Sequence, residues 1–180
     1  PGLTLDALAV LAPKFRHIFY GCELYPPPIE YRCKAENYMH CSVSECEHLF
    51  AAGICIEVIE HMWPHQLKQL AEDISKSSQP GAIYYFNSAQ PIHVKNHDPG
   101  YLDPYRRGHI ASYSLQGLQE IFSKHGFTVL PLHGREWGFL VEYKSVSNSD
   151  ITASELLERI WTPVDKNVEV LASNGFGPLM

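Results

Sequence analysis

Two carboxylates and an imidazole stand close together in the sequence, at Glu57, Glu60 and His61. They follow the apolar run 54–56, which is typical of a strand buried on both faces of a parallel sheet. Pro64 comes next and favours the first turn of a helix. The three residues thus follow the carboxyl end of a strand, and in open α/β sheets ligands bind at the edge where the strands have their carboxyl ends. If the segment forms one helical turn, the three side chains lie on one face of it. The three residues could hold a cation or share acid–base work, although acidic residues near a helix start also occur on ordinary solvated surface.

The elements that must position these side chains alternate along the chain. Apolar runs predict strands at residues 17–22, 38–43, 53–56 and 81–86, followed by an antiparallel hairpin of residues 127–132 and 139–143. Apolar residues at helical spacing predict helices between Thr4, as N-cap, and Pro13, over 29–37, from Pro64 through Ile74, from Ser114 to Gly126, and over 151–161. This order predicts an α/β fold: a three-layer α/β/α sandwich with a Rossmann-like, mostly parallel sheet and a C-terminal antiparallel hairpin.

Residues 1–144 are expected to form this domain, and residues 145–180 a tail that begins with a polar linker and contains the last helix. The long irregular stretch 91–112 is typical of a binding loop or lid. His93 and His97 lie four residues apart in it. The prolines and the glycine around them argue against a regular helix, so we assign both histidines to the substrate loop or to the surface.

Composition and charge narrow the class of protein. The 180-residue chain is 45% hydrophobic and 19% charged, as in ordinary globular domains. Its net charge is −6 and its basic residues form no long run, which disfavours a nucleic-acid partner. No apolar run is long enough to span a membrane. The five cysteines contain no C-x-x-C pair, which indicates reduced thiols in a cytoplasmic protein rather than a disulfide or zinc framework.

Four segments together resemble the class I S-adenosylmethionine-dependent methyltransferases, across about residues 1–144. They are Pro-Gly at 1–2 before a helix, Tyr-Gly-Cys-Glu at 20–23, the segment 54–61, and residues 107–115 with Gly-Phe at 126–127. The resemblance implies that Gly2 ends the glycine-rich loop around the methionine part of the cofactor. It also implies that Glu23 binds the ribose hydroxyls and that Ser42 and Val43 line the adenine. The family usually has an acidic residue before a small residue in this adenine-lining segment, and this sequence has no acidic residue there.

The Glu57-x-x-Glu60-His61 spacing resembles a narrower subset, the metal-dependent O-methyltransferases of ubiquinone biosynthesis and of small-RNA 3′-end methylation. In the latter a second histidine follows the fifth strand, and His109 holds the matching position here. The resemblance implies Glu57, Glu60, His61 and His109 as ligands of Mg²⁺, Mn²⁺ or Zn²⁺. It implies a catalytic role for Glu60, His61 and His109, with Glu57 close to the cofactor as well. His61 could instead be a metal-free general base, and His109 a loop histidine bonded to backbone.

The first strand and nearly all of the glycine loop of the family have no counterpart in this sequence. In the family that strand lies between the strand ending at Glu23 and the strand beginning at Gly53. Without it two unpaired strand edges would remain inside the sheet. We therefore expect a fragment, an incompletely represented polypeptide, or a protein completed by a partner.

These observations favour an S-adenosylmethionine-dependent methyltransferase acting on a hydroxyl of a small molecule or of a sugar or glycan, with help from a divalent metal. Residue types do not decide between oxygen, nitrogen and carbon as the methyl acceptor. The alternative is a catalytically silent, methyltransferase-like interaction module. A cofactor-free metallohydrolase using the same cluster is a more distant possibility.

Overall fold

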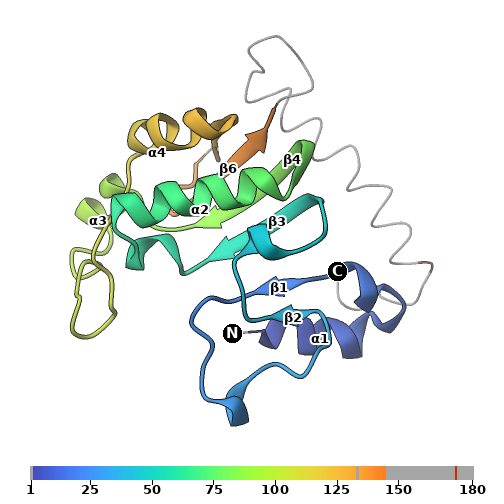
Figure 1. Ribbon diagram of the computed structural model, residues 1–180. Helices are drawn as coiled ribbons and strands as arrows, with labels where there is room; N and C mark the ends of the chain where they lie inside the picture. Colours follow the sequence, from blue (N-terminus) through green and yellow to red (C-terminus); the bar gives the residue numbers. More distant parts are fainter. Residues whose placement is uncertain (1, 133, 145–172, 174–180) are drawn as a thin grey trace.

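The computed structural model describes residues 2–132, 134–144 and 173 (Figure 1). Its main sheet has the strand order β3-β4-β6-β5. The strands are β3 (Phe50–Ile56), β4 (Ser78–Asn87), β5 (Phe127–Pro131) and β6 (Gly138–Tyr143). β3 is parallel to β4, whereas β6 is antiparallel to both β4 and β5. The predicted Rossmann-like α/β fold and its terminal hairpin are therefore confirmed, while the predicted linker and helix of the tail lie outside the described residues.

A second, two-stranded parallel sheet pairs β1 (Gly21–Cys22) with β2 (Tyr38–Met39), and α1 (Leu3–Leu11) lies beside it (Figure 1). β1 lies next to β3 in the same figure, yet no ladder joins the two sheets in the part of the chain that is described. β1, β2, β3 and β4 point the same way in this view. Their carboxyl ends therefore meet at one edge, with an unpaired strand edge on each side of the break, as expected from the sequence.

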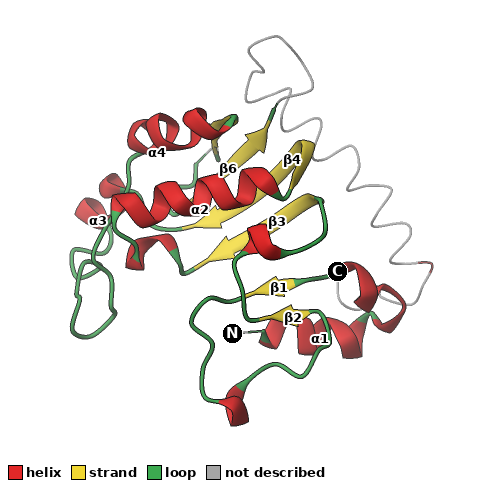
Figure 2. Cartoon of the chain, in the orientation of Figure 1, coloured by secondary structure: helices red, strands yellow, loops and turns green. Residues whose placement is uncertain are grey.

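Two helices cover one face of the main sheet (Figure 2). α2 (Pro64–Lys76) begins at Pro64 and buries Leu67, Ala71 and Ile74. α4 (Leu115–Phe122) is capped by Ser114, whose hydroxyl accepts a hydrogen bond from the backbone N–H of Gly117 at 3.1 Å. The core beneath them is aromatic, with the rings of Phe86 and Phe139 stacked at 5.1 Å. Within the described residues, no helix is both long enough and apolar enough to cross a membrane.

The first forty residues differ from the predictions. α1 begins at Leu3 with Gly2 as its N-cap, so Thr4 lies inside the helix. The predicted strand 17–22 is reduced to β1, because its one partner among the described residues, β2, is equally short. The remainder and the predicted helix 29–37 are replaced by single 3₁₀ segments, η1 (Pro13–Ile18) and η2 (Ile29–Tyr31).

β2 is also shorter than the strand predicted at 38–43. It ends at Met39, and η3 (Val43–Glu45) takes the place of its last residues. The Ser42 hydroxyl accepts from the backbone N–H of Ser44, which starts this turn. The segment therefore forms a capped turn instead of continuing the strand that its apolar residues favour.

The prediction that residues 54–56 are buried on both faces is wrong in the described structure. Cys55 packs toward the core under α2, whereas Ile54 and Ile56 on the opposite face are 63% and 46% exposed. β3 is an edge strand of the main sheet and pairs only with β4 in the described residues. Apolar composition alone could not tell an interior strand from this edge position.

The segment around His93 forms a helix, contrary to the prediction made from the neighbouring prolines and glycine. α3 (Pro91–Asn96) carries His93 and begins with Pro91 at its first turn, where the missing N–H of proline is harmless. The prediction for this segment is wrong because it treated Pro91 as a breaker rather than as a helix start.

Candidate metal centre

Glu57 and Glu60 follow the carboxyl end of β3 in two different environments. Glu57 is the first residue after the strand and has a φ of 54°, in the left-handed region that non-glycine residues rarely adopt. Glu60 lies in η4 (Ile59–His61) and is fully buried, whereas the Glu57 side chain is 56% exposed. The predicted single helical turn carrying all three residues is therefore wrong, since Glu57 precedes the turn. Strained backbone of this kind is concentrated at functional sites.

His109 is held against η4 by the backbone. The N–H groups of Ile110 and Ala111 both donate to the carbonyl oxygen of Glu60, at 2.8 and 3.1 Å. The His109 Nε2 atom then lies 4.0 Å from Oε1 of Glu60 and 3.9 Å from Oε2 of Glu57. The structure thus brings His109 to the glutamates that the sequence analysis grouped with it.

The orientation of His61 is set by the same segment. Its Nδ1 donates to the carbonyl oxygen of Gly108 at 3.0 Å, which leaves the lone pair of Nε2 free to bind a ligand. The His61 and His109 rings approach edge-to-face with centroids 5.0 Å apart. Gly108 has a φ of 73°, and a Cβ there would stand 3.1 Å from Nδ1 of His61. Glycine is therefore required both by the backbone and by the imidazole beside it.

The geometry and chemistry of this cluster fit a divalent cation. One ligand atom each from Glu60, His61 and His109 lies within 4.8 Å of the other two. Both carboxylate oxygens of Glu60 are buried without a hydrogen-bond partner. Buried polar atoms are rarely left unpaired, and a carboxylate with two imidazoles is a usual ligand set for Mn²⁺ or Zn²⁺.

Burial also shifts the protonation of these ligands. It raises the pKa of Glu60 to about 7, because the charged carboxylate is taken out of water. Burial lowers the pKa of His109, with His61 adding to the effect, so the neutral imidazole that binds metals is favoured. A bound cation would favour the ionised form of Glu60 and so remove the penalty of its burial.

Tyr101 supports His109 from behind. The two rings pack with centroids 4.4 Å apart, and the Tyr101 hydroxyl accepts from the backbone N–H of Ala89 at 3.2 Å. Tyr101 is buried although it lies in the long segment after α3. Sequence reasoning did not assign it a role; the only signal was an aromatic residue in a polar loop.

Three of the residues predicted to bind the cofactor, Glu23, Ser42 and Val43, follow β1 or β2 in the chain. Glu23 follows β1 directly, and Gly2 precedes α1 with a φ of 74°. The Ser42 hydroxyl donates to Oδ2 of Asp73 at 2.7 Å, and the Val43 carbonyl accepts from the Ser77 hydroxyl at 2.7 Å. The ribose and adenine assignments remain predictions. Glu23 nevertheless lies at the same edge of the fold as the metal centre, as the strand directions in Figure 1 show.

Comparison with known proteins identifies the architecture. No protein-family model matches the sequence, and no curated protein matches it significantly. Among solved structures, human N-acetylserotonin methyltransferase in complex with S-adenosylmethionine superposes with a TM-score of 0.50 and 13% identity over 79% of this chain. The S-adenosylmethionine-dependent methyltransferase SibL gives a TM-score of 0.50 and 14% identity over 78% of this chain.

The chain has a methyltransferase fold. It spans 45% of the length of the human methyltransferase and 48% of SibL. At such identities the likeness establishes the fold alone, and the chemistry has to be argued from the site.

Proposed function

We propose that this chain is an S-adenosylmethionine-dependent methyltransferase that methylates a hydroxyl of a small molecule or sugar with the help of a divalent cation. The observation that supports this most is the buried, unpartnered carboxylate of Glu60 facing two imidazoles at the carboxyl edge of the sheet. Ligand sites of open α/β folds lie at this edge. The comparisons support the methyltransferase fold, and the cluster supports the cation.

Glu60, Nε2 of His61 and Nε2 of His109 would hold the cation, with Glu57 within reach of His109. A bound Mg²⁺, Mn²⁺ or Zn²⁺ lowers the pKa of a hydroxyl beside it. In the transfer, the acceptor oxygen bonds to the methyl carbon while the bond from that carbon to sulfur breaks, releasing S-adenosylhomocysteine. The hydroxyl proton needs a base, and the exposed Glu57 carboxylate would accept it.

A catalytically silent module is the second candidate. It is favoured by the absence of a ladder between β1 and β3 in the described residues, since the cofactor would lie across that break. This candidate predicts no affinity for S-adenosylhomocysteine.

The test is methyl transfer from isotopically labelled S-adenosylmethionine to a panel of hydroxyl compounds by the full-length protein, in Mn²⁺ and then in EDTA. We expect EDTA to abolish transfer and the double variant Glu60→Ala/His61→Ala to lose at least about 100-fold in rate. The matched control His65→Ala/Glu72→Gln changes an exposed histidine and a solvent-facing glutamate on α2 and should keep the rate. Full activity of the Glu60/His61 variant would overturn the proposal.

A further inference from the structure

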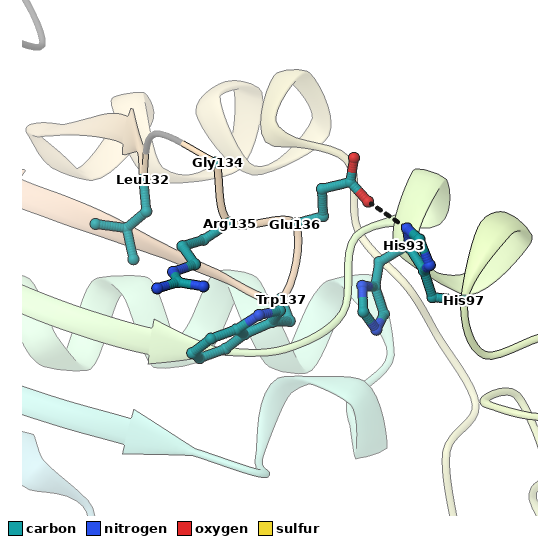
Figure 3. A pocket seen from close by; sticks show the side chains of 7 residues that line it. All are labelled: His93, His97, Leu132, Gly134, Arg135, Glu136 and Trp137. Atoms are coloured by element: carbon teal, nitrogen blue, oxygen red, sulfur yellow. Dashed lines mark ion pairs between the residues drawn. The ribbon is translucent and has the colours of Figure 1, made fainter.

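An open cavity of about 560 Å³ lies between the α3 region and the loop that precedes β6 (Figure 3). It is lined by His93 of α3, by His97 directly after this helix, and by Leu132, Arg135, Glu136 and Trp137 between β5 and β6. The volume is in the range of small-molecule sites. None of these residues belongs to the metal centre or to the predicted cofactor site.

Backbone hydrogen bonds connect this cavity to the metal centre. The N–H groups of Ser88 and Gln90 donate to the carbonyls of Trp137 and Glu136, at 3.2 and 2.8 Å. Ala89, between them, donates to the hydroxyl of Tyr101, the residue that packs on His109. The segment 88–90 therefore has the cavity wall on one side and the support of the metal centre on the other. This segment joins the cavity to the proposed site of methyl transfer.

The cavity presents a cation above an aromatic ring. The Arg135 guanidinium lies 5.7 Å from the centroid of the Trp137 ring and forms no ion pair with any carboxylate of the described residues. The carboxylate of the neighbouring Glu136 points away, toward His97, with Oε2 3.8 Å from Nε2 (Figure 3). Trp137 is 40% exposed. The exposed Arg135 guanidinium therefore stands beside an accessible indole without a carboxylate partner among the described residues.

We propose that this cavity binds the methyl acceptor and that the acceptor is an aromatic compound carrying a carboxylate. A guanidinium pairs with a carboxylate through two parallel hydrogen bonds, and Arg135 has its N–H groups free to do so. The aromatic ring would pack against Trp137 and Leu132. This inference rests on the proposed methyltransferase function and specifies its substrate class.

Calorimetric titrations without cofactor test the ligand class with three probes: 4-hydroxybenzoate, phenol, and 4-hydroxycyclohexanecarboxylate. We expect 4-hydroxybenzoate to bind at least about tenfold more tightly than phenol, which lacks the carboxylate, and than the cyclohexane compound, which lacks the aromatic ring. Arg135→Gln should weaken 4-hydroxybenzoate about tenfold and leave phenol unchanged. The matched control Arg16→Gln, an exposed arginine on η1, should bind like the parent. Equal binding of 4-hydroxybenzoate and phenol, or parent-like binding by Arg135→Gln, would overturn the inference.

A methyl-transfer assay with the same probes separates this inference from the proposed function. Arg135-dependent binding of 4-hydroxybenzoate without any methylated product supports the anionic aromatic site and contradicts the methyltransferase proposal. Methylation of a neutral hydroxyl compound, with no binding of 4-hydroxybenzoate, supports the methyltransferase proposal and overturns the acceptor class.

Discussion

Glu60 determines much of the chemistry of the metal centre. Its side chain is fully buried and neither carboxylate oxygen has a hydrogen-bond partner, which raises its pKa to about 7. Ionising such a group in the folded protein is unfavourable unless a positive charge lies next to it. The ionisation of Glu60 therefore links the stability of the folded protein both to pH and to metal binding.

In EDTA, the parent protein should be increasingly destabilised relative to Glu60→Gln as pH rises from about 5 to 8. The pKa of this glutamate is about 7 when folded against a reference value of 4.5, so between these values the folded chain binds the extra proton. Stability contributed by that proton is lost as pH rises through the folded pKa. Urea unfolding at both pH values should show the difference between variant and parent growing by about 2 kcal/mol.

Two further observations check this pH dependence. Glu120→Gln changes an exposed glutamate on α4 and should show a constant difference from the parent across the same range. Saturating Mn²⁺ should restore much of the parent's stability at pH 8. A difference between Glu60→Gln and parent that does not change with pH would contradict the buried, unpartnered state of Glu60.

The spacing of residues in the sequence predicted which side chains could bind a metal, but it did not predict how they are arranged in space. Glu57, Glu60 and His61 share one segment, so their spacing could be interpreted directly from the sequence. Their contact with His109 depends on two backbone hydrogen bonds to Glu60, and no local pattern encodes such a long-range bond. The same holds for Tyr101, whose role is visible only after the chain has folded.

At the scale of elements, the segment 108–111 acts as a clamp on η4. It contributes a carbonyl to His61, two N–H groups to Glu60, and the His109 imidazole itself. A change in its backbone should therefore disturb two ligands together while leaving the core intact.

Gly108→Ala should weaken Mn²⁺ binding about tenfold, because its new Cβ would lie 3.1 Å from Nδ1 of His61 on a backbone with a φ of 73°. Gly134→Ala is the matched control, since its φ is 67° and a Cβ there meets nothing within 4 Å. Both variants introduce a similar backbone strain, but only Gly108→Ala should show a lower affinity for Mn²⁺ in a titration. Equal affinities of the two variants would show that the clamp does not position His61.

Elements with strong local signals were predicted correctly. α2 has Pro64 at its start and buries Leu67, Ala71 and Ile74. α4 has the Ser114 cap and buries Leu118 and Phe122. The predictions of a strand at 17–22 and of a helix at 29–37 were wrong. In the part of the chain that the structure describes, β1 has only the two residues of β2 to pair with. In such segments, contacts with the rest of the fold determine the secondary structure.

At the scale of the whole molecule, two sheets bring their carboxyl edges to one side. The predicted ribose ligand Glu23 lies on one sheet, and the metal centre follows β3 of the other. The order of elements was sufficient to predict this architecture, because alternating strands and helices allow few arrangements. The break between β1 and β3 was also expected, whereas the exposure of Ile54 and Ile56 was not.

The most direct test of the account is pulsed electron paramagnetic resonance of Mn²⁺ added to the metal-free protein. Spin-echo modulation detects nitrogen nuclei bound to the metal, and we predict coupling from two imidazoles. His61→Ala and His109→Ala should each remove one of these couplings, and Glu60→Ala should abolish tight binding. Mn²⁺ that remains free, or that binds without nitrogen coupling, would contradict a cation site made by Glu60, His61 and His109.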